Sequence, residues 1–212
     1  YGYLPQKIQQ EQITDIIICG GDGTISGIAA HLAGTTVRVG IIPMGSGNGL
    51  ALAAGISKDP NKAIDIILQN KPGLIDGFMI NQHFSCVLCG LGFDAQVAHD
   101  FAGQSSRGLS TYVKQTIKNF FASKTYPFVI EFEKQKIQCE ALFISIANSN
   151  QFGNQVTIAP KASLNDGLLD IVVVNKMSKL ATLFALLRQI KMGKVTQFSE
   201  HNIVFRGVMY LQ

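Results

Sequence analysis

Apolar runs alternate with glycine-rich turns and amphipathic segments over the first third of the chain. Residues 16–19 and 37–42 are mostly apolar runs rich in β-branched side chains, which is typical of buried strands. Each run leads through a glycine-rich turn into a segment of helical character, over residues 24–32 and 50–54. Two strand–turn–helix units in series predict parallel strands joined by right-handed crossovers, with both turns at the same edge of the sheet.

Two further helices are expected in this first region. Residues 62–69 form one of them, with Asp59-Pro60-Asn61 as its N-terminal cap. Residues 1–14 are polar and rich in glutamine, and they are compatible with a helix that leads into the first strand.

The pattern changes after Lys71-Pro72-Gly73, where strand-like runs begin to dominate. Residues 128–133 alternate apolar and polar side chains toward their end, as half-exposed antiparallel strands do. We therefore expect an α/β lobe over residues 1–73 and a mostly antiparallel β domain over residues 74–212. The strands expected in that domain cover residues 74–80, 84–89, 128–132, 136–147, 168–174 and 202–211, and helices over residues 111–121 and 179–191 interrupt them.

The composition is that of a folded globular protein. Hydrophobic residues make up 47% of the 212 residues and charged residues 15%, which excludes a disordered chain. The net charge of +4 is too small and too scattered to indicate a nucleic-acid-binding protein. No signal peptide opens the chain, and its most apolar helical stretch, residues 180–187, is too short to span a bilayer. We therefore expect a cytoplasmic protein.

The four cysteines, Cys19, Cys86, Cys89 and Cys139, are expected to be buried thiols in a reducing compartment. Cys86 and Cys89 have the C-x-x-C spacing, but they lie in an apolar run that is typical of a strand. Positions three apart on a strand point to opposite faces, so these two sulfurs would not share a metal ion.

The strongest chemical signal is a pair of glycine-rich loops, one after each predicted strand. The first is Gly20-Gly21-Asp22-Gly23-Thr24 and the second is Pro43-Met44-Gly45-Ser46-Gly47-Asn48-Gly49. Glycine lets the backbone approach a ligand closely, and the free N–H groups at the start of a helix favour an anion. Two such loops in series indicate a site for the phosphates of a nucleotide.

Asp22 is the unexpected residue in this setting, because a carboxylate beside a phosphate is electrostatically unfavourable. One interpretation gives it a catalytic role, either at Mg²⁺ or as a general base toward an attacking hydroxyl. The other makes it a turn residue that bonds its own backbone. Thr24 has two compatible roles, as a donor to a phosphate and as a cap of the helix.

These loops and several downstream motifs resemble the catalytic domain of the diacylglycerol kinase and sphingosine kinase family, which includes bacterial lipid kinases. The match runs from about residue 15 to residue 175 in the family's order and spacing. It implies a lobe like that of NAD kinases and 6-phosphofructokinases, then a β-sandwich, with ATP in the cleft between them. The downstream motifs are Gly90-Leu91-Gly92-Phe93-Asp94-Ala95, Arg107-Gly108-Leu109 with Tyr112, Asn148-Ser149-Asn150 with Phe152-Gly153, Ile158-Ala159-Pro160, and Leu164-Asn165-Asp166-Gly167-Leu168-Leu169-Asp170.

The resemblance also implies roles for individual residues. Asp22 would be catalytic, and Asp94 would bind the head group of the lipid, unless Asp94 caps a helix over residues 95–101. The residues that would hold the ATP phosphates are Gly20, Gly21, Gly23, Thr24, Gly45, Ser46, Gly47 and Asn48.

A structural Mg²⁺ is implied at the D-G-x-L-D turn, as in the bacterial enzymes. The Asp166 carboxylate and the main-chain carbonyls of Ser163 and Leu168 would bind it, and hard oxygen ligands of this kind suit Mg²⁺. Without the resemblance, Asn165-Asp166-Gly167 indicates a hairpin or turn.

The chain departs from the family pattern in three ways. Gly49 stands where the family's G-T-x-N-D loop has Asp, and Ser46 replaces its Thr but keeps a hydroxyl. Ser26 and Gly27 stand where an Asn-Glu pair is usual, so a polar contact is lost. The opening strand with its N-P-x-x-G loop and the late D-G-E stretch, which supplies a base in bacterial members, are both missing. We therefore expect a fragment, or a chain whose ends are not represented.

The resemblance to this family implies a lipid kinase that uses ATP and Mg²⁺. It would phosphorylate a hydroxyl of a diacylglycerol or sphingoid-base type of lipid at the periphery of a membrane. An NAD-kinase-like soluble kinase and a non-catalytic nucleotide- or lipid-binding relative are the alternatives. The predicted helix over residues 111–121 suits either docking at an anionic surface through Lys114 and Lys118 or simple packing with a solvated face. The oligomeric state is left open, a homodimer included.

Overall fold

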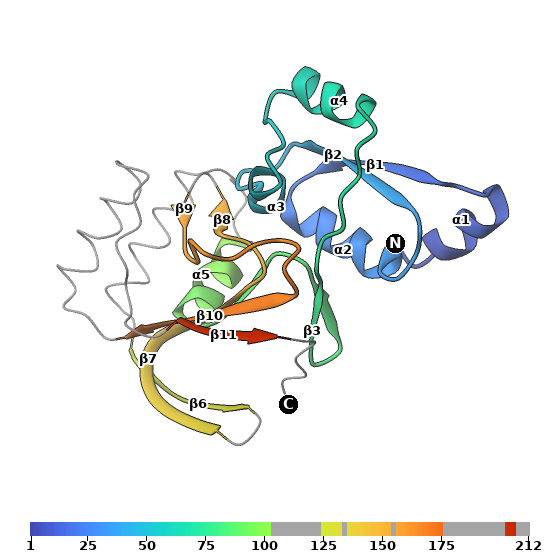
Figure 1. Cartoon of the computed structure of the whole chain (residues 1–212). Coiled ribbons are helices and arrows are strands. Elements are labelled where there is room, and N and C mark those ends of the chain that lie inside the picture. Colours follow the sequence, from blue (N-terminus) through green and yellow to red (C-terminus); the bar gives the residue numbers. More distant parts are fainter. Residues whose placement is uncertain (103–123, 133–134, 154–155, 176–201, 207–212) are drawn as a thin grey trace.

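The computed structural model shows an N-terminal α/β lobe followed by a mostly antiparallel β region (Figure 1). This architecture confirms the predicted fold class. The structure describes residues 1–102, 124–132, 135–153, 156–175 and 202–206. The helices predicted over residues 111–121 and 179–191 lie outside the described residues.

The N-terminal lobe is built on a parallel pair of strands. β1 (Asp15–Gly20) pairs with β2 (Arg38–Pro43) in register, from Asp15 opposite Arg38 to Gly20 opposite Pro43. α2 (Asp22–Leu32) connects the two strands and buries Ile25 against their inward-facing isoleucines. α4 (Pro60–Leu68) covers the other face, where a Cβ added to Gly40 would lie 2.9 Å from the side chain of Ile67. Both predicted strand–turn–helix units are confirmed.

The remaining helices of this lobe also agree with the sequence-based predictions. α1 (Leu4–Glu11) precedes β1, and the short α3 (Gly49–Ala53) follows β2. Asp59 caps α4 as predicted, because its carboxylate accepts a 2.9 Å hydrogen bond from the Asn61 N–H. α2 begins at Asp22, two residues before the predicted start, so Asp22 belongs to the first turn of the helix.

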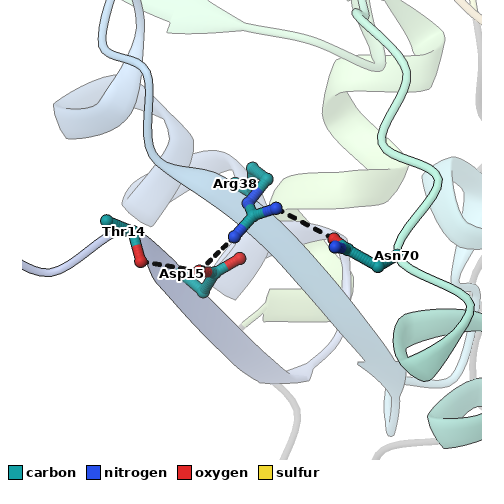
Figure 2. A network of polar contacts seen from close by, with 4 residues as sticks. All are labelled: Thr14, Asp15, Arg38 and Asn70. Carbon is teal, nitrogen blue, oxygen red and sulfur yellow. Dashed lines mark hydrogen bonds and ion pairs between the residues drawn. The ribbon is translucent and has the colours of Figure 1, made fainter.

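A polar network lies at the end of this sheet where both strands begin, away from the glycine-rich loops (Figure 2). The Arg38 guanidinium donates to the Asp15 carboxylate at 2.7 Å and to the Asn70 side-chain oxygen at 2.9 Å. Thr14 donates to the same carboxylate at 2.7 Å. The network therefore ties the starts of both strands to the end of α4. The hydrogen bonds from Arg38 and Thr14 hold the pKa of Asp15 below its ordinary value.

The β region centres on one antiparallel sheet with the strand order β11-β10-β7-β5, and β6 also pairs with β7. The 13-residue β7 is long enough to pair with β6 through its first half and with β5 and β10 through its second half. Figure 1 shows how strongly β7 curves between these two sets of partners. These strands are β5 (Leu88–Gly92), β6 (Tyr126–Phe132), β7 (Gln135–Ala147), β10 (Leu168–Asn175) and β11 (Asn202–Arg206).

The strand predicted over residues 84–89 is wrong as a single element. β4 (His83–Ser85) pairs with β3 (Phe78–Ile80) in a small hairpin, whereas β5 joins the large sheet. Cys86 lies between the two strands and Cys89 lies on β5, so the C-x-x-C spacing does not describe one strand. All four cysteines are free thiols, but only Cys86 is buried as predicted: Cys89 and Cys139 are partly exposed and Cys19 is exposed.

Three elements complete the β region. β8 (Gln151–Gly153) pairs with β9 (Val156–Thr157), and neither strand was predicted. α5 (Phe93–Ala102) follows β5 directly. Among the helices that the structure describes, none is long and apolar enough to cross a membrane.

Acid should remove the contribution of the Asp15–Arg38 pair to stability. Because the folded-state pKa of Asp15 lies below its unfolded value, this contribution is complete above the ordinary carboxylate pKa and is lost as the pH falls through the folded value. We expect Asp15→Asn to lower the melting temperature slightly at neutral pH, and we expect this deficit to shrink toward zero as the pH falls below the ordinary carboxylate pKa, measured by circular dichroism. Lys7→Gln, which removes the exposed ion pair with Glu11, is the control. A deficit in Asp15→Asn that persists at low pH would contradict the assignment.

Candidate functional site

The first glycine-rich loop is a tight turn from β1 into α2. Gly20 ends the strand and Asp22 begins the helix, so only Gly21 lies between them. A Cβ added to Gly20 would lie 2.8 Å from the Cβ of Thr24, which leaves no room for a side chain. The first N–H groups of a helix have no acceptor within it, so this turn presents donors suited to an anion.

The second glycine-rich loop lies directly against the first. The Met44 N–H donates to the Gly20 carbonyl at 3.0 Å, which extends the strand ladder past the ends of β1 and β2. A Cβ on Gly45 would lie 2.6 Å from the Cα of Gly21, and one on Gly21 would lie 2.9 Å from the Cα of Gly45. The two backbones touch where neither residue can carry a side chain.

Asp22 ties the two loops together through its carboxylate. One oxygen accepts from the Gly49 N–H at 2.9 Å and the other accepts from the Leu50 N–H at 3.0 Å. These are the first two residues of α3, and their N–H groups have no acceptor within that helix. Asp22 therefore caps a helix 27 residues further along the chain, so the interpretation that it bonds its own backbone is wrong. Its catalytic role stays a prediction.

The residues predicted to hold phosphates meet at this corner. Gly23 and Ser46 are exposed, and the others are partly exposed, with the exception of Asn48, which is buried. The Asn48 side chain bonds the backbone of its own loop, accepting from the Gly45 N–H at 2.8 Å and donating to the Gly45 carbonyl at 2.7 Å. The exposed members are therefore the ones placed to meet a ligand.

Residues of the β region also reach the second loop. Gly153 of β8 has a φ of +121°, and a Cβ added to it would lie 2.8 Å from the Cα of Gly47. This close approach packs β8 directly on the loop, so the loop lies between the two parts of the chain.

Ser26 and Gly27, which stand where the family usually has an Asn-Glu pair, contact other parts of the chain. Ser26 hydrogen-bonds the buried thiol of Cys86, and Gly27 packs against the ring of Tyr1, which would lie 3.1 Å from a Cβ added to Gly27. Burial, with a smaller effect from the negative charge of Asp22, raises the pKa of Cys86 to about 11. The thiol therefore stays protonated and neutral next to the candidate site.

The turn predicted to hold Mg²⁺ is exposed, and hydrogen bonds among its own residues stabilise it. One carboxylate oxygen of Asp166 accepts from the Leu168 N–H at 3.0 Å, and the Ser163 hydroxyl donates to the Asn165 side-chain oxygen at 3.1 Å. Gly167 takes a φ of +71°, as glycine does readily in such turns. The turn indicated by Asn165-Asp166-Gly167 is confirmed.

Asp76 braces this turn, and it was missed by sequence reasoning. Its N–H donates to the Leu164 carbonyl, and its carboxylate accepts from the Gly167 N–H, each at 2.6 Å. The Asn148 amide donates to the Asp76 carbonyl at 2.8 Å. Asp76 lies in the run predicted as a strand over residues 74–80, of which only Phe78–Ile80 forms β3, and nothing in the sequence linked it to a segment 91 residues away.

A third carboxylate lies close to the same turn. Burial raises the pKa of Asp170, the negative charge of Asp166 adds to the shift, and Lys161 opposes it. Over the described residues, no group of three or more histidine, cysteine or acidic side chains is arranged to hold a metal ion. A cation at the turn would therefore depend on Asp166 together with main-chain oxygens, which is a donor set that suits Mg²⁺.

Asp94 lies inside α5, one position after the first residue of that helix. The alternative in which Asp94 caps a helix that begins at residue 95 is therefore wrong. Its predicted role at a lipid head group stays a prediction.

Family models match both parts of the chain. The diacylglycerol kinase catalytic domain matches residues 3–80, and the YegS C-terminal NAD kinase beta sandwich-like domain matches residues 87–207. The chain is 30% identical over 195 residues to a probable lipid kinase YegS-like protein of Cronobacter sakazakii, covering 88% of this chain and 64% of that protein. It is 28% identical over 166 residues to a diacylglycerol kinase of Bacillus subtilis, covering 76% of this chain and 55% of that enzyme.

Solved structures show the same fold. A putative diacylglycerol kinase from Bacillus anthracis str. Sterne superposes with a TM-score of 0.69 at 20% identity, covering 96% of this chain and 70% of that one. The chain spans between 39% and 64% of the length of the first curated relatives that it matches.

Filling the gap between the two loops should destabilise the lobe. Gly45→Ala would place a methyl group 2.6 Å from the Cα of Gly21, so the strand ends must separate. Overpacking against backbone typically costs about 1–3 kcal/mol in the free energy of unfolding, which urea denaturation would measure. Gly73→Ala, which has open space around its Cβ, is the control. Equal stability of the two variants would show that the loops do not touch as described.

Proposed function

This chain belongs to the diacylglycerol kinase family, and we propose that it is a lipid kinase that transfers the γ-phosphoryl group of ATP to a lipid hydroxyl. The observation that carries the proposal is the contact of two glycine-rich loops at the carboxyl ends of two parallel strands. Ligands of open α/β sheets bind at that edge. Curated relatives named as a diacylglycerol kinase and as probable lipid kinases support the same reaction class.

The corner supplies the two things that phosphoryl transfer requires, which are positioning and charge stabilisation. The N-terminus of α2 offers unpaired N–H groups and the positive end of a helix dipole to the phosphates. The exposed hydroxyl of Ser46 and the loop backbone would hold the phosphates from the other side. The glycines allow the nucleotide to approach the backbone closely.

Asp22 would orient or deprotonate the attacking hydroxyl. Each of its oxygens accepts one backbone N–H and keeps a further lone pair for a second donor. Because those two bonds hold the carboxylate in place, it needs no rearrangement when the substrate binds.

The lipid would enter from the β region, with Asp94 near its head group. We assign residues 1–73 to the nucleotide-binding lobe and residues 74–212 to the lipid-binding domain. The kinase would act in the cytoplasm at the periphery of a membrane, because its second substrate is dissolved in the bilayer.

Mg²⁺ would have two roles in this enzyme. One ion would accompany ATP and neutralise the charge that develops on the phosphates. Another would be held by Asp166 and the main-chain carbonyls of Ser163 and Leu168, as part of the structure. Asp76 and Asn148 support the turn that would present those ligands.

Replacing Asp22 by Asn should abolish transfer while nucleotide binding survives. Loss of a general base typically lowers the turnover number about 100-fold or more, and Asn keeps one acceptor oxygen for the α3 cap. Transfer is measured as the formation of radiolabelled lipid phosphate from labelled Mg·ATP and mixed lipid vesicles. Nucleotide binding is measured as the ATP-induced rise in melting temperature. Asp65→Asn, on the exposed side of α4, is the matched control. An unchanged rate for Asp22→Asn would rule out the catalytic role.

The same assay separates the alternatives. Label that stays in the aqueous phase when NAD is present would indicate an NAD-kinase-like enzyme and would sink the lipid proposal. Stabilisation by ATP without any labelled product would identify a non-catalytic binding protein.

Removing the Asp166 carboxylate should remove a specific response to Mg²⁺. We expect millimolar Mg²⁺ without nucleotide to raise the melting temperature of the unmodified chain but not that of Asp166→Asn, because a bound ion stabilises the folded state by mass action. Asp65→Asn should respond as the unmodified chain does. If Asp166→Asn and the unmodified chain shift equally, the turn does not hold the ion.

A further inference from the structure

Asn48 sits in the second phosphate loop but is closed off from any ligand. Only 2% of its surface is exposed. Its amide is engaged at both ends, because the oxygen accepts from the Gly45 N–H and the nitrogen donates to the Gly45 carbonyl. Its backbone has a φ of 55°, in the left-handed region, which asparagine tolerates better than most side chains. Because the side chain is buried and bonded to its own loop, it is not placed for the direct phosphate contact expected of Asn48 from the family pattern.

The side chain lies at the point where the two loops meet. Its oxygen is 2.9 Å from where a Cβ of Gly45 would sit and 3.9 Å from where a Cβ of Gly21 would sit. The next two residues, Gly49 and Leu50, are the ones held by the Asp22 carboxylate. Asn48 thus bonds to the start of the loop at Gly45, and Asp22 bonds to the backbone at its end.

We propose that Asn48 is a positioning residue of the phosphate site, which acts through the backbone of residues 45–47 and the hydroxyl of Ser46 without touching the nucleotide. This inference rests on the proposed function of the loops in ATP binding. A free loop with glycines at positions 45, 47 and 49 would have to be ordered when the phosphates bind, and that ordering would weaken binding. The Asn48 amide removes the cost by holding the loop in one shape beforehand.

The first test is the affinity for Mg·ATP, measured by isothermal titration calorimetry on the full chain. Asn48→Gly keeps the left-handed backbone accessible but removes both side-chain bonds, so we expect binding to weaken about tenfold or more. Asn48→Asp keeps an acceptor for the Gly45 N–H but cannot donate to the Gly45 carbonyl, so it should also weaken binding, and it serves if the glycine variant does not fold. Asn81→Gly replaces another asparagine with positive φ, in the β3–β4 turn, and should bind as the unmodified chain does.

The second test is a double-mutant cycle with Ser46→Ala, which separates positioning from direct contact. If Asn48 acts through the loop that carries Ser46, the double variant Asn48→Gly/Ser46→Ala should lose little more affinity than the worse single variant. Losses that multiply would mean that Asn48 contributes independently, which would overturn the inference. Equal ATP affinity in the unmodified chain and both Asn48 variants would overturn this inference alone. An unmodified chain that binds no ATP would overturn the proposed function as well.

Discussion

The approach of the Gly21 and Gly45 backbones determines the geometry of the corner where the two glycine-rich loops meet. A side chain at either residue would lie within 3 Å of the backbone opposite, so two glycines are the condition for the loops to touch. The Asp22 carboxylate reaches the start of α3 across this junction, and it supplies acceptors to two N–H groups that have none within the helix. The parallel register of β1 and β2, which ends with Gly20 opposite Pro43, delivers both loops to this point.

The β region is held in place relative to the corner by a shared core. Ile18 and Leu50 of the N-terminal lobe pack in the same buried cluster as Cys86 and Val87, which connect β4 to β5. The buried Asn148 at the end of β7 donates to the carbonyls of Asp76 and Cys86, at 2.8 and 3.1 Å. Buried amides with satisfied donors fix a unique packing, because an alternative arrangement would leave them unpaired. The candidate metal turn is therefore anchored to the same core as the phosphate loops, through Leu164 and Asp76.

Local patterns predicted those elements whose causes are local. The apolar run over residues 16–19, the glycines that follow it and the Asp59 cap each determine the structure of their own neighbourhood, and each was predicted correctly. The break between β4 and β5 was missed because Cys86 and Val87 are as apolar as strand residues, and only pairing with different partners separates them. The hydrogen-bond partners of Asp22 and Asp76 lie 27 and 91 residues away, so no spacing rule could have identified them. The two loops were predicted as phosphate sites from their glycines, and that role stays a prediction; their mutual contact depends on three-dimensional register, which the sequence does not reveal.

The position of Asp22 resolves the electrostatic objection to a carboxylate beside phosphate loops. A negative charge there would repel an anion if it were unpaired, but two backbone N–H groups of α3 already stabilise it. The phosphates would face a different set of donors, at the N-terminus of α2, where the helix dipole favours negative charge. The hydrogen bonds that this carboxylate accepts are a structural reason for its place at this corner. Its presence alone is not evidence of catalysis, because the cap it provides is sufficient reason for an aspartate at this position. A catalytic role has to rest on the lone pairs of the Asp22 carboxylate that the cap leaves free. The two hydrogen bonds to α3 give this carboxylate a structural reason to be there, and the same bonds would hold its free lone pairs in a fixed direction.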